Sequence, residues 1–184
     1  LFHEPDERFW VGADFTRSDR YLVIGVGSSV TSEEWLVDAD DLRGEPRIVW
    51  PRREGVEYGS EHAMVGGEDV LYILHNDEAL DFELVRVAAS DPSGPREVVL
   101  AHRPGIRLLG LSTFRDWGVL GYRREGIARL GMFDYVDGAV DELSFDEPLY
   151  SVGSGGNPEW APPLVRIGYG SFTTPGTVYD YDVA

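Results

Sequence analysis

Short apolar or alternating runs recur along this chain at a constant spacing. The first series comprises Tyr21–Gly25, Val70–Leu74, Trp117–Gly121 and Leu164–Gly168, whose starts lie about 48 residues apart. A second series follows each member of the first in step, at Glu34–Val37, Phe82–Val85, Ile127–Leu130 and Thr177–Asp180. Runs of this length and pattern are typical of β-strands. Two markers that share one period indicate four copies of a single structural unit.

This period predicts a β-propeller, because about 40 to 50 residues build one four-stranded blade. We expect four blades, at about residues 8–50, 57–100, 107–145 and 149–184, each a four-stranded antiparallel sheet with the last one incomplete. No stretch shows a sustained 3.6-residue apolar period between helix caps, so the predicted fold class is all-β. One blade cannot bury both of its faces, and most rings need more than four blades. The sequence therefore predicts a partial β-propeller that belongs to something larger.

The turn residues refine this prediction. In the first blade we expect strands at Arg8–Phe15, Arg20–Gly27, Glu33–Asp38 and Arg47–Trp50, separated by polar turns. The stretch Gly153–Pro158 has the composition of a linker between domains, but its register places it between the first and second strands of the fourth blade. We therefore expect a loop there.

The composition narrows the class of protein. The chain has 184 residues, of which 42% are hydrophobic, and its 22 Gly and 11 Pro suit a fold with many turns. No apolar run is long enough to cross a bilayer, and the polar start lacks the pattern of a signal peptide. The chain starts at Leu1, which we interpret as the start of a fragment. It has no Cys, which fits a reducing cytoplasm and removes thiolate chemistry.

The charge is strongly acidic. The formal net charge is −17, with 33 acidic residues against 16 basic ones, all of them Arg. This balance argues against a nucleic-acid partner, because phosphate binding needs a basic surface. It is compatible with cationic peptides, which an acidic surface attracts over long range. An acidic surface that only keeps the protein soluble is the simpler alternative.

No serine in the chain has the surroundings of a catalytic nucleophile. The nucleophile elbow of an α/β-hydrolase needs Gly-x-Ser-x-Gly before a helix. Gly110–Phe114 fails at Phe114, Val152–Gly156 fails at Val152, and Gly168–Phe172 has the wrong spacing. We therefore predict no catalytic residue in this chain.

Other candidate motifs are weak as well. The four histidines, His3, His62, His75 and His102, fall at no metal-ligand spacing, and we interpret His62 and His75 as residues at strand ends. Asp38–Asp41 lacks the Gly and distal Glu of a calcium loop, and a polar hairpin turn is the expected structure. Gly25–Ser29 lacks the third Gly and the following helix of a phosphate loop. We predict no cofactor and no metal. Carboxylate pairs are plentiful, but sequence alone cannot place two of them together.

Arginines collect on one rim of the predicted ring. They are Arg52, Arg53, Arg103, Arg123 and Arg124. In the blade register this rim carries the loops that join second to third strands and the loops that join one blade to the next. Guanidinium groups in a row suit docking to the carboxylates of a partner domain. Solvated surface charge is the alternative.

Several stretches resemble oligopeptidase B, within the prolyl oligopeptidase family of serine peptidases. They are Arg20–Ile24, Thr31–Glu33, Leu36–Asp40, Pro51–Tyr58, Phe145–Tyr150, Asn157–Glu159 and Gly168–Tyr179. The last of these is similar to a stretch shared across that family. The resemblance extends over essentially the whole chain and agrees with the propeller that the period predicts.

The resemblance implies a two-domain enzyme in which a seven-bladed propeller caps an α/β-hydrolase domain with a Ser-Asp-His triad. Oligopeptidase B cleaves short peptides after Arg or Lys. This chain would supply about the last four blades and end before the hydrolase domain, so its expected partners are that domain and, for the whole enzyme, short basic peptides. The fragment alone is expected to be inactive. A non-catalytic propeller that binds peptides or proteins is the alternative, although Trp-Asp signatures are missing and Trp117 follows Asp116 instead.

Overall fold

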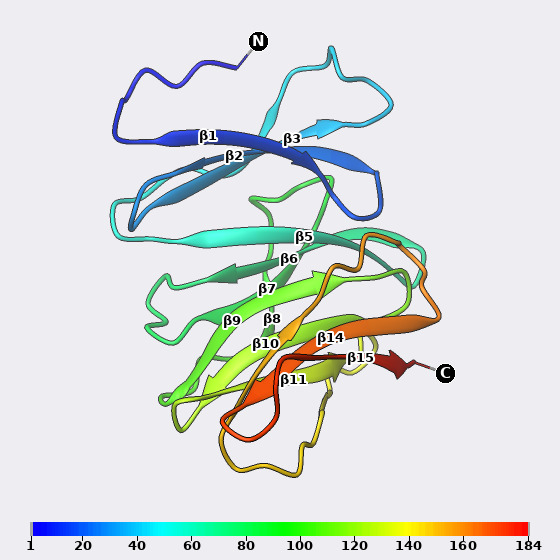
Figure 1. Ribbon diagram of the computed structural model, residues 1–184. Helices are drawn as coiled ribbons and strands as arrows, with labels where there is room; N and C mark the ends of the chain where they lie inside the picture. The colour runs from blue at the N-terminus through cyan, green and yellow to red at the C-terminus, as the bar shows by residue number, and fades with distance from the viewer. Residues whose placement is uncertain (1, 184) are drawn as a thin grey trace.

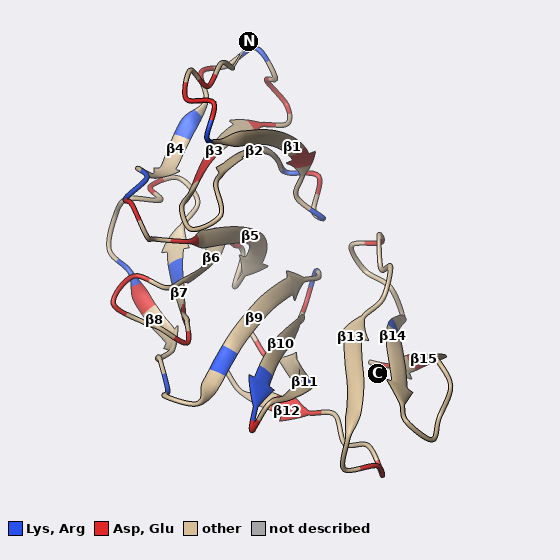
Figure 2. Ribbon diagram, turned by 60° about the vertical axis from the view of Figure 1, so that its left-hand side comes forward, with Lys and Arg blue, Asp and Glu red and all other residues tan. Residues whose placement is uncertain are grey.

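A computed structural model describes residues 2–183 and places them in four antiparallel sheets arranged as an arc (Figures 1 and 2). We refer to the sheets as blades one to four. Three blades have four strands and the last has three, as the sequence predicts. Residues 2–183 contain no helix, and hence none long and apolar enough to cross a membrane. The all-β, partial-propeller prediction is confirmed.

The strands of each blade follow one another in chain order. Blade one comprises β1 (Trp10–Phe15), β2 (Tyr21–Gly27), β3 (Ser32–Asp38) and β4 (Arg47–Trp50). Blade two comprises β5 (Tyr58–Val65), β6 (Glu68–His75), β7 (Glu83–Ala88) and β8 (Glu97–Leu100). Blade three comprises β9 (Ile106–Thr113), β10 (Gly118–Arg124), β11 (Ile127–Phe133) and β12 (Val140–Glu142). Blade four comprises β13 (Tyr150–Ser154), β14 (Leu164–Ser171) and β15 (Thr177–Asp182).

The strand boundaries differ from the prediction where local hydrogen bonds compete with the sheet. The first strand begins at Trp10 and not at Arg8, because Asp6 organises a turn before it. The backbone N–H of Phe9 donates to the carbonyl of Asp6 at 3.0 Å, and the N–H of Arg8 donates to the Asp6 carboxylate. Gly153 belongs to β13, so only the later part of the predicted 153–158 loop is irregular.

Alternation along each strand builds the contacts between blades. On β6, Leu71 and Ile73 pack with blade one, whereas Val70 and Tyr72 pack with blade three. Successive side chains of a strand point to opposite faces, so a blade in the middle of the arc is apolar on both sides. Three clusters of buried side chains result, one at each junction between neighbouring blades.

The two ends of the arc keep apolar side chains in contact with solvent. On β1, Trp10 is 72% exposed and Val11 is 49% exposed. On the fourth blade, Val178 and Tyr179 are exposed as well. Figure 2 places these blades at opposite ends of the arc. Exposed apolar faces at both ends are the expected consequence of a propeller segment whose terminal blades have a neighbour on one side only.

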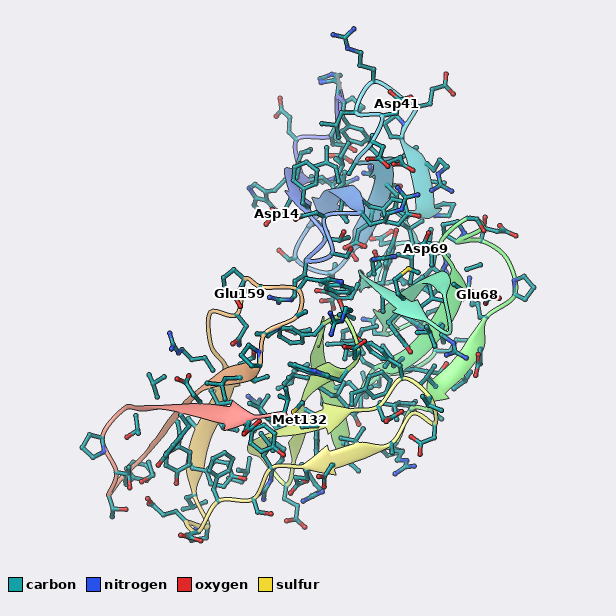
Figure 3. The ribbon with its side chains drawn as sticks, turned by 90° about the vertical axis from the view of Figure 1, so that its right-hand side faces the viewer. Asp14, Asp41, Glu68, Asp69, Met132 and Glu159 are labelled. Carbon is teal, nitrogen blue, oxygen red and sulfur yellow. The ribbon has the colours of Figure 1, made fainter. Side chains whose placement is uncertain are left out.

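One long connection crosses from blade four toward the other blades. Residues 155–163 join β13 to β14, and the carbonyl of Trp160 accepts a hydrogen bond from the backbone N–H of Arg115 in blade three at 2.9 Å. Glu159, on the same loop, helps to line a cavity together with Asp14 of β1 (Figure 3). The stretch is therefore a loop within blade four, as predicted, and it contacts blade three.

Candidate functional site

The innermost strands of the four blades are β1, β5, β9 and β13, which face the inside of the arc (Figure 2). Because all neighbouring strands are antiparallel, the β2–β3, β6–β7 and β10–β11 loops lie at the same end of the blades as the connections between blades. We call this end the arginine rim, after the five arginines of the sequence analysis. The arginines are described first, and then a cavity whose lining includes the loop after β2.

Arg52 is bound within the chain itself. Its side chain donates to the carboxylate of Glu33, through Nε at 3.2 Å and Nη2 at 3.1 Å, and also to the carboxylate of Glu4. Its guanidinium lies over the ring of Phe9, 4.2 Å from the ring centre. Burial alone would raise the pKa of Glu33, but hydrogen bonds from Arg52 and Trp35 outweigh it and lower that pKa. Arg52 therefore fastens the N-terminal segment onto blade one.

The other four arginines divide into two kinds. Arg53 pairs with Asp77 of blade two, and Arg124 pairs with Glu142 of blade three at 2.9 Å. Arg103 and Arg123 are exposed and make no ion pair with any residue in the described range 2–183. Of the five arginines, only Arg103 and Arg123 therefore have side chains without an ion pair to a described residue.

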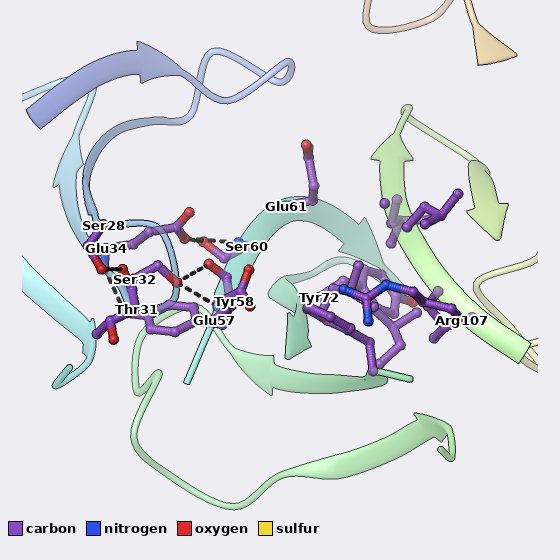
Figure 4. Close-up of a pocket in the computed structure, with 18 residues that line it drawn as sticks. Ser28, Thr31, Ser32, Glu34, Glu57, Tyr58, Ser60, Glu61, Tyr72 and Arg107 are labelled. Atoms are coloured by element: carbon purple, nitrogen blue, oxygen red, sulfur yellow. Dashed lines mark hydrogen bonds between the residues drawn. The ribbon is translucent and has the colours of Figure 1, made fainter. Parts of the chain in front are cut away.

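A cavity of about 540 Å³ is lined by residues of blades one, two and three (Figure 4). The loop after β2 contributes Ser28 and Thr31, which places the cavity at the arginine rim. Apolar side chains from three strands form part of its wall: Leu74, Leu84, Leu108 and Leu111. Carboxylates enter the same cavity from blades one and two.

Glu34 is the most buried of these carboxylates. Its Oε2 accepts a hydrogen bond from the Ser60 backbone N–H at 2.9 Å and another from the Ser60 hydroxyl at 2.5 Å (Figure 4). Burial raises the pKa of Glu34 to about 7, and the nearby charge of Glu61 acts in the same direction. Desolvation penalises the charged form of a carboxyl group, which is why this pKa moves upward.

Glu61 is a second carboxylate in the cavity wall. In Figure 4 its side chain projects from β5 into the space between blades one and three. It accepts a hydrogen bond from the Thr113 hydroxyl at 3.1 Å, and burial raises its pKa. Sequence reasoning missed both Glu34 and Glu61. Glu34 lies on blade one and Ser60 on blade two, and no local pattern brings them together.

His62 lies in the middle of β5 and is only 1% exposed, so its predicted position at a strand end is wrong. Its Nε2 lies 2.9 Å from Oδ1 of Asp69, and its Nδ1 lies 2.7 Å from the Ser18 hydroxyl of blade one. Burying an imidazole costs little free energy when both of its ring nitrogens are hydrogen-bonded. His62 therefore joins the β1–β2 hairpin to blade two. His75, by contrast, ends β6 as predicted.

The remaining predicted motifs have ordinary structural roles. Asp38 and Asp40 both pair with Arg20, at 3.0 and 3.3 Å, and lie at the turn after β3, as expected for a polar hairpin turn. Gly25 and Gly27 belong to β2, and β3 follows them directly instead of a helix. Across residues 2–183, no group of three or more His, Asp or Glu side chains is arranged to hold a metal ion.

The fold and the site together define a segment of a β-propeller whose inner cavity is acidic. The model of the prolyl oligopeptidase N-terminal β-propeller domain matches residues 1–184. The chain therefore belongs to the prolyl oligopeptidase family.

Individual relatives agree with this assignment. The chain is 31% identical to Protease 2 of Moraxella lacunata, with 97% of the chain and 25% of that protein covered. It is 30% identical to dipeptidyl aminopeptidase BI of Pseudoxanthomonas mexicana, with 98% of the chain and 24% of that protein covered. The chain thus spans about a quarter of the length of these relatives.

Solved structures show the same likeness. Oligopeptidase B from Trypanosoma brucei, in a closed form with covalently bound antipain, superposes with a TM-score of 0.87 and 29% identity. That match covers 99% of this chain and 27% of the other. Oligopeptidase B from Leishmania major gives a TM-score of 0.86 at 26% identity, covering 98% of this chain and 26% of the other.

Proposed function

We propose that this chain is the propeller segment of a serine peptidase similar to oligopeptidase B, which hydrolyses short peptides after Arg or Lys. The observation that carries the proposal is the superposition on oligopeptidase B over almost the whole chain, together with the family match. The strongly acidic charge supports it, because a net charge of −17 attracts basic peptides. We further propose that the enzyme is cytoplasmic.

In this proposal the chemistry belongs to a hydrolase domain outside the chain. There a histidine takes the proton of the nucleophilic serine, an aspartate orients the histidine, and backbone N–H groups stabilise the oxyanion. The propeller acts by its shape. It covers the active site, excludes folded proteins and keeps water away, while opening between the domains admits peptides.

The chain alone should not hydrolyse peptides. Ser18, His62 and Asp69 form a hydrogen-bonded series, but its imidazole is buried and the Ser18 oxygen is also 3.0 Å from the Thr16 hydroxyl. A peptide bond cannot approach an imidazole that is enclosed in this way. We therefore assign this series to structure and expect catalysis only when the hydrolase domain is attached.

The arginine rim is the proposed contact with the hydrolase domain. Arg103 and Arg123 extend from it without an ion pair to a described residue. A guanidinium in that position can pair with a carboxylate of the partner domain. Arg52 contributes differently, because it holds its own blade together through Glu33 and Glu4.

The test is a comparison of the full-length gene product with residues 1–184. Both are assayed on matched fluorogenic peptides that end in Arg, Lys or Pro before the reporter. We expect the full-length protein to release the reporter after Arg and Lys, and residues 1–184 to release none. A full-length protein that cleaves none of them but binds peptides would instead indicate a non-catalytic binding propeller. Cell fractionation with an antibody tests the cytoplasmic location.

A further inference from the structure

The loop between β14 and β15 holds an aromatic side chain in solvent. Phe172, the first residue of this loop, is 97% exposed. The loop follows the second strand of blade four, and because neighbouring strands are antiparallel it lies at the arginine rim with the connections between blades. Single exposed apolar residues are common in proteins. The shape of the loop and its surroundings therefore decide whether Phe172 has a role.

Hydrogen bonds fix the shape of this loop. The carboxylate of Glu147, on the β12–β13 connection, accepts from the hydroxyls of Ser171 and Thr173 at 2.5 Å each and also from the hydroxyl of Thr174. These bonds lower the pKa of Glu147 to about 2, so the carboxylate stays charged at neutral pH. The backbone N–H of Ser171 also donates to the carbonyl of Thr174 at 2.9 Å. Phe172 is thus presented on an ordered turn.

An apolar hollow of about 450 Å³ lies beside Phe172. Leu149 and Pro175, which are both exposed, line it together with Phe172, and Ile127 of blade three reaches it as well. The described residues that line this hollow include no charged side chain. A continuous apolar patch in contact with water marks a surface that binds a partner.

Val136 provides a contrast within the same chain. It is 91% exposed on the turn between β11 and β12, at the opposite end of the blades. Its backbone N–H donates to the carboxylate of Asp134 at 2.6 Å, and Asp137 follows it in the sequence. Charged neighbours interrupt the apolar surface there, so Val136 is the reference for an exposed apolar residue without a patch.

Three observations indicate what covers the patch around Phe172. The chain spans about a quarter of the length of its relatives, and a domain of the same polypeptide is the neighbour with the highest local concentration. Two copies of the chain would each carry a net charge of −17 and repel one another. Arg103, on the β8–β9 connection at the same end of the blades, has no ion pair to a described residue. A partner surface with an apolar centre and carboxylates around it matches this rim.

We propose that Phe172, with Leu149 and Pro175, is the apolar anchor by which the propeller segment docks on the hydrolase domain. Phe172 inserts into an apolar pocket of that domain, and the ordered turn lowers the entropy that docking costs. Aromatic residues on rigid supports are frequent anchors of interfaces for this reason. The inference rests on the proposed function and assigns the domain contact to named side chains of blade four.

The first experiment measures whether position 172 is covered in the full-length protein. The 184-residue chain contains no Cys, so Phe172→Cys and Val136→Cys each add one thiol to it. The rate of reaction with N-ethylmaleimide is measured by mass spectrometry of the peptide that carries the thiol, and it is divided by the rate in urea. We expect this ratio to be about 10-fold lower at position 172, because labelling there requires the domains to open. Equal ratios at the two positions overturn the proposal.

A second pair of variants tests whether Phe172 holds the domains together. In the full-length protein, Phe172→Ser should raise the radius of gyration and lower kcat/KM for an Arg peptide about 10-fold, because the anchor is lost. Val136→Ser is the matched control and should stay within about twofold of the parent in kcat/KM. Both side chains are exposed in the propeller segment, so neither change should unfold the blades. Unchanged scattering and kinetics in Phe172→Ser overturn the role of anchor.

The labelling experiment also separates this inference from the proposed function. If no peptide is hydrolysed, the peptidase proposal fails, but slow labelling at position 172 that is independent of protein concentration still supports docking within the chain. If peptides are cleaved and position 172 reacts as fast as position 136, the anchor is refuted and the peptidase proposal stands. Protection that disappears on dilution would identify a second copy as the partner and overturn the proposal.

Discussion

The phenolic oxygen of Tyr58 donates a hydrogen bond to the carbonyl oxygen of Trp50 at 2.6 Å, and the two aromatic rings lie 5.3 Å apart. Trp50 is the last residue of β4 and Tyr58 is the first residue of β5. The outermost strand of blade one is thus bound directly to the innermost strand of blade two. Tyr58 also accepts the backbone N–H of Glu34 at 2.7 Å, so one buried hydroxyl serves three strands.

Removing that hydroxyl should destabilise the chain without changing its shape. In Tyr58→Phe the buried carbonyl of Trp50 and the buried N–H of Glu34 lose their hydrogen-bond partner. Leaving one buried polar group without a partner typically costs about 1–3 kcal/mol. We expect a total loss of about 2–3 kcal/mol in the free energy of unfolding, measured by urea denaturation. The exposed Tyr179→Phe is the control and should change stability by less than about 0.5 kcal/mol. Equal stabilities of the two variants would contradict the assigned role.

Glu34 should make the chain less stable as the pH rises from about 4.5 to about 7. In the unfolded chain this carboxyl group ionises near its ordinary pKa of 4.5, whereas burial delays ionisation in the folded chain to about 7. Between these values the folded state binds more protons than the unfolded state, so stability falls with increasing pH, by up to about 3 kcal/mol. Above pH 7 both states are ionised and the loss is complete.

The Glu34→Gln variant tests the predicted fall in stability with increasing pH. The variant should match the parent chain near pH 4.5 and exceed its stability by about 2–3 kcal/mol at pH 8, because glutamine stays neutral. Thermal or urea unfolding at several pH values measures the difference. A difference between parent and variant that is the same at pH 4.5 and pH 8 would show that Glu34 is not held neutral by burial.

Arg52 should matter to folding far more than Arg123 does. Arg52→Met leaves Glu33 buried without its cation and should lower the free energy of unfolding by about 3 kcal/mol. Arg123→Met removes an exposed guanidinium and should change stability by less than about 0.5 kcal/mol. Urea unfolding of the two variants side by side measures the contrast. Similar losses in both would mean that the Arg52–Glu33 pair contributes little.

Reversing the charge of Arg103 and Arg123 should weaken the contact between the propeller and the hydrolase domain, and it should leave the blades folded. In the full-length protein, Arg103→Glu together with Arg123→Glu should weaken domain closure and reduce kcat/KM for peptides about 10-fold. The melting temperature of residues 1–184 with the same changes should stay within a few degrees. Small-angle X-ray scattering reports the opening of the domains. Unchanged kinetics and unchanged scattering would remove these two residues from the interface.

His75 should make the chain sensitive to acid. Burial lowers its pKa, and neither ring nitrogen has a hydrogen-bond partner in the described part of the chain. The nearby charged groups are Glu83, Asp77, Arg96 and Arg53. The unfolded state takes up a proton near pH 6.5 and the folded state resists it, so stability falls as the pH decreases below about 6.5.

His75→Leu should reduce that loss, because leucine takes up no proton in the unfolded state. The free energy of unfolding is compared at pH 7.5 and pH 5. His62 contributes in the same direction through burial, so the variant should retain part of the acid sensitivity. The exposed His3→Leu is the control. An acid sensitivity that His75→Leu leaves at its full size would exclude His75 as a source.

Much of the fold was predictable from local patterns. The repeated runs that begin at Tyr21, Val70, Trp117 and Leu164 all became second strands of successive blades. Alternation and turn residues are properties of neighbouring residues, so they can be recognised without knowing the fold. The arginine rim stays a prediction that rests on the same reasoning, because antiparallel strands reverse direction at every turn.

The candidate site depended on the tertiary structure. Glu34 contacts Ser60 because blade two packs against blade one. Arg52 contacts Glu4 because the N-terminal segment lies against the connection that follows blade one. Whether an arginine is free or already paired, and whether a carboxylate is buried or solvated, follows from these distant contacts. The sequence by itself determined the repeating unit, its strands and their direction, since these follow from short-range chemistry. Only the packing of blade against blade decided which charges are paired within the chain and which stay unpaired, because these contacts join residues that are far apart in the sequence.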